Sequence, residues 1–174
     1  MTRLVLCSTI LYRTIQRNFM KNKEALNIIK ELFERSEICC YLTTLNNENL
    51  PETRAMMNLR NISLYPDLVN FFKKHEDDFS IYFSTNTFSP KISQIKNNPN
   101  VCVYYSKPDE YKGCMLCGKI NIVTDQSIKN SIWQDNWTMY YPGGPTDVDY
   151  TILELKPTSL KVYSQLSTFT IKKD

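Results

Sequence analysis

The sequence has few of the residues on which several common enzyme classes depend. Its 174 residues include only 4 glycines and 1 histidine. No G-x-G-x-x-G or Walker segment occurs, which argues against a Rossmann or P-loop enzyme, because both need glycine-rich turns around phosphate groups. The single histidine, His75, lies far in sequence from the cysteines, and we predict no metal site.

Charge and apolar runs narrow the choice of partners. The formal net charge is +3, with 21 basic residues spread among 18 acidic ones, so we predict no nucleic-acid partner. The apolar run from Leu4 to Tyr12 is too short to span a bilayer, and we predict no membrane association. The length is typical of one domain that buries about two-thirds of its unfolded surface.

The first nineteen residues differ from the rest. They contain Arg3, Arg13 and Arg17 but no acid, as a weak signal or transit peptide does, yet no small-x-small cleavage site follows. Met20 opens a segment typical of a domain start. We therefore predict a loosely ordered extension over residues 1–19 and a single domain over residues 20–174.

The cysteines point to a reducing, cytoplasmic environment, since most lie inside apolar, strand-like runs. Cys114 and Cys117 have the C-x-x-C spacing of metal or redox pairs. On a strand, however, residues three apart point to opposite faces, and no second pair follows. Two buried strand cysteines are the preferred interpretation.

The stretch from Ile81 to Tyr105 organises the chain as strand, hydroxyl-rich turn, short helix and strand. Ser89 suits an N-cap and Pro90 the first helical position, and Lys91 follows at once. A helix N-terminus carries unpaired N–H groups and partial positive charge, which an adjacent ammonium reinforces. We interpret this point as a phosphate pocket; an ordinary capped surface helix with a solvated lysine is the alternative.

Hydrophobic periodicity predicts a mainly β protein with flanking helices. An arginine at position 54, in mid-strand, is either solvated or a charge for the phosphate pocket, and His75 is expected at the surface. The order of short strands favours an antiparallel barrel. Helices are expected over residues 20–37, 66–74 and after Asp125, and strands over residues 38–45, 50–59, 81–83, 101–105, 114–124, 150–155 and 159–164.

In sequence order, these motifs resemble the pyridoxamine 5′-phosphate oxidase-like flavoproteins, most closely their general stress protein branch. The resemblance covers about residues 20–163. It is carried by Thr43-Thr44, Arg54-Ala55-Met56, Phe83-Ser84-Thr85, Ser89-Pro90-Lys91, Asn98-Pro99, Val101 to Tyr105, Gly118, Asp125, Trp133 and Pro142-Gly143-Gly144.

The resemblance implies a six-stranded antiparallel split β-barrel of Greek-key type, forming a homodimer with FMN between the subunits. By motif, Arg54, Ser89 and Lys91 would hold the FMN phosphate. The ribityl chain and one ring edge would lie along Met56, Phe83, Ser84 and Thr85. Trp137 and Tyr140 are candidates for flavin contacts from the partner subunit, with aromatic core or dimer interface as the preferred alternative.

The resemblance leaves two functions open. One is an FMN-dependent reductase or oxidase of a small molecule in a stress response, with a nicotinamide cofactor as possible electron donor. The other is a non-catalytic flavin-binding stress protein, a store or sensor. The chain ends soon after its last predicted strand, without the tryptophan- and arginine-bearing segment of the authentic oxidases, which argues against pyridoxamine phosphate oxidation. Haem-handling relatives rely on histidine, which argues against haem here.

Overall fold

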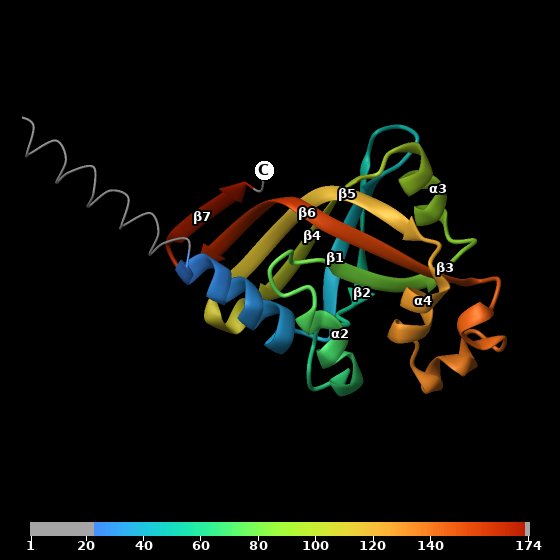
Figure 1. Cartoon of the computed structure of the whole chain (residues 1–174). Coiled ribbons are helices and arrows are strands. Elements are labelled where there is room, and N and C mark those ends of the chain that lie inside the picture. The colour runs from blue at the N-terminus through green and yellow to red at the C-terminus, as the bar shows by residue number, and fades with distance from the viewer. Residues whose placement is uncertain (1–22, 173–174) are drawn as a thin grey trace, which may run out of the picture.

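The structure is a computed structural model that describes residues 23–172. The predicted extension over residues 1–19 and the domain start at Met20 lie outside the described residues. Residues 23–35 are helical, as their periodicity predicts, and the face carrying Ala25, Ile29 and Leu32 is fully buried in the main core. In Figure 1 this helix lies across one end of the sheet.

The described strands form one antiparallel, curled sheet with the order β2-β1-β4-β5-β6-β3, and β7 pairs with β6 off this path (Figure 1). This confirms the mainly β split-barrel class, with one strand more than the six predicted. Their bounds are β1 (Cys39–Leu45), β2 (Pro51–Met57), β3 (Ile81–Asn86), β4 (Asn100–Lys107), β5 (Lys112–Val123), β6 (Tyr150–Ser164) and β7 (Ser167–Lys172).

The C-terminal strands differ from the prediction. Residues 150–155 and 159–164 form one strand, β6, which runs through Pro157. The proline lies opposite Gly118 and next to a bulge in β6, because Cys117 pairs with Ser159 and Gly118 with Pro157, which leaves Thr158 as the extra residue. At such a bulge the ladder does not need the N–H that proline lacks. A Cβ at Gly118 would lie 2.8 Å from the Lys156 carbonyl oxygen, so the close approach requires glycine. A further strand that was not predicted, β7, covers residues 167–172, and its Phe169 packs against the core.

Helices and short 3-10 turns cover the outside of the sheet. Strand β3 is apolar on both faces: Ile81 and Phe83 belong to the barrel core, whereas Tyr82 belongs to a second apolar cluster under α2, α4 and the turns that follow α4. The bounds are η1 (Pro66–Leu68), α2 (Val69–Lys73), α3 (Pro90–Asn97), η2 (Pro108–Glu110), α4 (Gln126–Ile132), η3 (Asp135–Met139) and η4 (Gly144–Thr146).

The C-x-x-C cysteines lie on one strand, as the preferred interpretation holds. Cys114 is fully buried in the core, and Cys117, on β5 three residues later, is half-buried. Burial raises the pKa of the Cys114 thiol well above its ordinary value. Within residues 23–172, no group of three or more His, Cys, Asp or Glu side chains has the arrangement of a metal site. None of the helices in that range is long and apolar enough to cross a membrane.

Candidate functional site

Strands β2 and β3, the two ends of the sheet order, meet at a hollow of about 390 Å³. Residues 55–57 of β2 and 84–86 of β3 line it, and Trp137 and Tyr140 close it from the η3 segment. Edge strands carry backbone N–H and C=O groups that no neighbouring strand pairs. This seam, defined by residues 55–57 and 84–86, therefore offers polar backbone groups as well as side chains to a ligand.

A second hollow, of about 460 Å³, lies at the charged end of the seam and includes Arg54, Pro90 and Lys91 in its lining. Arg54 and Met56 are two residues apart on β2, so their side chains share one face of the strand. The two hollows thus follow one another along β2. Together they give an elongated site with a cationic end and an aromatic end.

Arg54 is held in place by polar side chains from three elements. Its Nη1 donates to Thr44 Oγ1 at 2.6 Å, and its Nη2 donates to Gln94 Oε1 at 3.1 Å. The same Nη2 lies 3.5 Å from Glu52 Oε2. Partial burial lowers the pKa of the guanidinium from its ordinary value. The predicted mid-strand arginine is therefore not a solvated side chain but a fixed charge facing the site.

Lys91 brings a second positive charge to the same point. Its Nζ donates to Thr85 Oγ1 at 2.8 Å, which joins the start of α3 to β3. Burial, and then repulsion from Arg54, lower the pKa of the Lys91 ammonium. In the described part of the chain Lys91 forms no ion pair. A bound anion would relieve both the desolvation and the repulsion of these like charges.

Ser89 differs from an ordinary helix cap. It occupies the N-cap of α3 with extended backbone, but its side chain makes no capping hydrogen bond. Its Oγ is buried without a partner among the described residues. By contrast, Asp125 Oδ1 caps α4 by accepting from the Ser127 N–H at 2.8 Å. A buried hydroxyl without a partner is not the arrangement of an ordinary capped helix, and at a helix N-terminus it can donate to an anion.

At the other end, the hollow is apolar and aromatic. Met56 is buried at its wall, and Ser84 and Thr85 supply hydroxyl groups. The structure does not bring Phe83 to either hollow, because Phe83 lies on the inward face of β3 and is 1% exposed in the barrel core. A contact between Phe83 and a cofactor stays a prediction.

Trp137 and Tyr140 line the hollow from their own chain. Trp137 is buried and packs edge-on against Trp133, with ring centroids 6.0 Å apart, so its preferred interpretation as aromatic core agrees with the structure. Tyr140 is 64% exposed. Their approach to a flavin from a partner subunit stays a prediction.

Three polar residues of the cationic end were not predicted as site residues: Thr44, Glu52 and Gln94. Besides its contact with Arg54, Gln94 donates from Nε2 to Glu52 Oε2 at 2.6 Å and accepts from Thr44 Oγ1 at 2.5 Å. One signal was present in the sequence, since Glu52 lies two residues before Arg54 and so shares its face of the strand. The pairing of Thr44 with Gln94 had no local signal.

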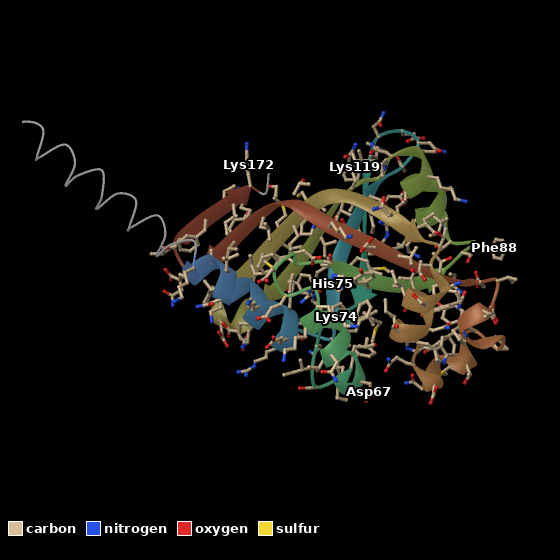
Figure 2. The ribbon with its side chains drawn as sticks, in the orientation of Figure 1. Asp67, Lys74, His75, Phe88, Lys119 and Lys172 are labelled. Atoms are coloured by element: carbon tan, nitrogen blue, oxygen red, sulfur yellow. The ribbon has the colours of Figure 1, made fainter. Side chains whose placement is uncertain are left out.

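His75, predicted as a surface residue, is partly exposed and has polar partners. Its side chain is 21% exposed, its Nδ1 lies 3.1 Å from Asp78 Oδ2, and its Nε2 lies 3.4 Å from the Tyr82 hydroxyl. Figure 2 shows it next to Lys74, after the end of α2. It lines neither hollow of the seam.

Comparisons with known proteins identify the family and the fold. The sequence profile of the family described as "Pyridoxamine 5'-phosphate oxidase like" matches residues 70–172, more than half of the chain. General stress protein 26 of Bacillus subtilis (strain 168) is 28% identical over 89 residues, which span 49% of this chain and 63% of that protein. The match thus covers less than two-thirds of that relative's length.

Solved structures extend the likeness over most of the chain. A protein related to general stress protein 26 from Clostridium acetobutylicum has a TM-score of 0.68 and 29% identity, covering 86% of this chain and 94% of the other. A heme binding protein from Mycobacterium smegmatis has a TM-score of 0.58 and covers 83% of this chain and 57% of the other. Its 10% identity shows a shared fold only.

The profile match covers only part of the site. The matched residues 70–172 include Ser84, Thr85, Ser89 and Lys91, whereas Arg54 and Met56 precede them. Arg54 and Lys91 line the second hollow, and Met56, Ser84 and Thr85 line the aromatic one, whereas Ser89 lines neither. The chain belongs to the pyridoxamine 5′-phosphate oxidase-like family.

Proposed function

We propose that the chain binds FMN along the seam and acts as a flavin-mediated reductase or oxidase of a small molecule in a stress response. The observation that carries this proposal is the buried Ser89 hydroxyl without a partner, at the start of a helix beside Lys91. Lys91 and Arg54 supply two positive charges there, and Glu52 is the acidic side chain in the lining. A phosphate dianion matches this combination of donors and charge.

Different side chains would contact different parts of FMN. Ser89, Lys91 and Arg54 would bind the phosphate, while Met56, Ser84 and Thr85 would lie along the ribityl chain and one ring edge. When bound, the flavin supplies the hydride-transfer chemistry, and the protein orients it and keeps water away. No Asp, Glu, His, Lys or Arg side chain lines the aromatic hollow of the described residues, so we assign no acid-base pair.

A homodimer is part of the proposal, because one outer face of the sheet is apolar next to the seam. Tyr41 lies between Ala55 and Tyr104 in register, and Tyr41 and Tyr104 are 42% and 36% exposed. Ala55 and Met57 also line the aromatic hollow, so a second copy on this face would complete its wall. Light scattering should give a dimer mass for the natural chain and a monomer mass for Tyr41→Lys, with the remote, exposed Tyr111→Lys as control.

The first test is the visible absorption spectrum of the purified protein, before and after adding FMN and desalting. We expect a retained flavin spectrum. A colourless protein that fails to retain added FMN would contradict the proposal while leaving the fold intact. The free thiols of Cys39, Cys40, Cys102, Cys114 and Cys117 support the further proposal of a cytoplasmic location.

The alternative is a flavin store or sensor without turnover. Among the described residues, no lysine, arginine, histidine or acidic side chain lines the aromatic hollow. This composition is as consistent with a store or sensor as with an enzyme in which the flavin alone does the chemistry. Consumption of NADH or NADPH by the FMN-loaded protein, with a quinone or nitro-compound as acceptor, separates the two. Steady turnover supports the enzyme, and tight flavin retention without turnover supports the binder.

A further inference from the structure

A third hollow, outside the seam, lies between the helix of residues 23–35 and α2. Its volume is about 200 Å³. Arg60 lines it, and most of the remaining wall is apolar, formed by Phe33, Leu59, Ile62, Tyr65, Val69 and Phe72. We call this space the Arg60 hollow. The proposed flavin function makes no use of it.

The Arg60 guanidinium is enclosed but not neutralised. Its carbon lies 4.6 Å from the Phe33 ring centroid and 4.7 Å from that of Phe72, so aromatic rings cover it. Its Nε donates to the Ser80 carbonyl at 2.9 Å and its Nη2 to the His75 carbonyl at 2.8 Å. Both acceptors are uncharged. Among residues 23–172, no acceptor pairs with Nη1 and no carboxylate forms an ion pair with the group.

The charges at the rim do not cancel that of Arg60. Lys30 and Lys73 are balanced by Glu34 and Glu76, and Lys30 Nζ lies 2.6 Å from Glu76 Oε1. The net charge of the lining is therefore +1, and it belongs to the arginine. Asp78 and Glu34 act on the group only through space, and burial lowers the pKa of Arg60 despite them. A buried cation without a carboxylate partner is costly, so an anion is favoured there.

The acceptors of Arg60 are fixed by a network on the outer face of β3. Asp78 Oδ1 accepts from the Ser80 N–H at 2.8 Å, and Asp78 Oδ2 lies 3.1 Å from the His75 ring. The Tyr82 hydroxyl contacts that ring and donates to Glu154 Oε1 at 2.5 Å. The loop that carries both carbonyls is thus braced, which holds the guanidinium in one orientation before any ligand arrives.

We propose that the Arg60 hollow binds a small monocarboxylate with an apolar body. The carboxylate would accept hydrogen bonds from the guanidinium, and the body would pack on the apolar wall. One uncompensated charge suits a monoanion better than a phosphate dianion, and 200 Å³ is below the size of most pockets for larger ligands. Tyr65 also lines the aromatic hollow of the seam, so it separates the two sites. The proposal does not depend on flavin binding.

Calorimetry with benzoate on the full chain tests the site. We expect saturable binding of benzoate, binding of the neutral analogue benzamide about ten- to a hundredfold weaker, and no competition by inorganic phosphate. Equal affinity for benzoate and benzamide, or displacement by phosphate, would overturn the proposal.

The location is tested without touching Arg60, which also supports the fold. Val69 is 43% exposed at the rim, so Val69→Trp fills the hollow from α2 and leaves the arginine contacts in place. Its neighbour Asn70 is exposed and outside the lining, which makes Asn70→Trp the matched control. Loss of benzoate binding only in Val69→Trp supports the site, and unchanged binding in both variants overturns it. FMN retention by the same samples reports on the seam separately.

Discussion

Arg54 and Arg60 lie six positions apart in the sequence, and the structure uses them in different ways. Arg54 is held by the side chains of Thr44, Glu52 and Gln94, with Lys91 lining the same open hollow. Arg60 is held by two phenyl rings and two backbone carbonyls. Rings and carbonyls belong to the fold itself, so Arg60 ties elements together. Arg54 instead depends on a network of polar side chains beside Lys91, which forms no ion pair among the described residues, so it contributes to the ligand site more than to the fold.

The largest expected difference between the two arginines is in stability. Arg60→Met removes two charge-assisted hydrogen bonds and two ring contacts and leaves buried carbonyls unpaired, so we expect the free energy of unfolding to fall by about 3 kcal/mol. Arg54→Met should cost about 1 kcal/mol or less, because its ion pair is partly exposed. Urea denaturation measures both. Equal losses would remove the distinction drawn between the two sites.

The expected effects on FMN affinity are the reverse of those on stability. Substitutions at the seam should weaken FMN binding, whereas substitutions at the Arg60 hollow should not. Lys91→Ala should weaken FMN by about ten- to a hundredfold, since a charged hydrogen bond is worth roughly 1.5 to 3 kcal/mol, and should leave riboflavin nearly unchanged. Lys96→Ala, on the exposed side of the same helix, is the matched control. Fluorescence titration of both flavins gives the comparison. Equal losses for FMN and riboflavin in Lys91→Ala would refute the phosphate assignment.

The cationic end of the seam was largely predictable because its signals are local. Ser89, Pro90 and Lys91 are consecutive, and adjacent residues of these types indicate where a helix begins. Gln94 was missed because its partner Thr44 lies fifty positions away, and no local pattern reports that contact. Phe83 was assigned to the site by motif, yet strand alternation turns it into the core.

The Arg60 hollow had no comparable signal. Its walls come from the helix of residues 23–35, the chain after β2 and α2, and the acceptors of Arg60 precede β3. Only the tertiary fold brings these segments together. The same holds for β6, which the sequence appeared to break at Pro157. Its continuity depends on a bulge in β6 next to Pro157, opposite Gly118 of β5, where the ladder does not need the N–H that proline lacks.

Ser89→Ala should have a smaller effect on FMN affinity, and it distinguishes a role of Ser89 in ligand binding from a role as a helix cap. Because Ser89 makes no capping hydrogen bond, its loss should leave the free energy of unfolding without ligand nearly unchanged. Asp125→Ala, which removes a working cap on α4, should cost about 1 kcal/mol. FMN affinity should fall about two- to tenfold in Ser89→Ala, the worth of one hydrogen bond. A clear loss of stability in Ser89→Ala would return it to the role of an ordinary cap.

The smallest expected effect is a pH dependence that links Lys91 to Arg54. Burial, and then repulsion from Arg54, lower the pKa of Lys91, so its charge is lost at a lower pH than the ordinary 10.5. FMN binding favours the protonated lysine. Above the second phosphate pKa of about 6, the ratio of FMN to riboflavin affinity should therefore be constant up to the lowered pKa of Lys91 and fall as the pH rises through it. The ratio cancels the ring ionisation that both flavins share.

Two variants sharpen this test. Lys91→Arg keeps its charge at alkaline pH, so the fall should disappear. Arg54→Gln removes the like charge, so the pKa of Lys91 should rise toward its ordinary value and the fall should move to higher pH. Arg60 is not a cause of the Lys91 shift, and a substitution there that preserves the fold should leave the profile in place. If the pH dependence of the affinity ratio is unchanged in the Arg54 variant but shifts in the Arg60 variant, the phosphate does not bind at the seam.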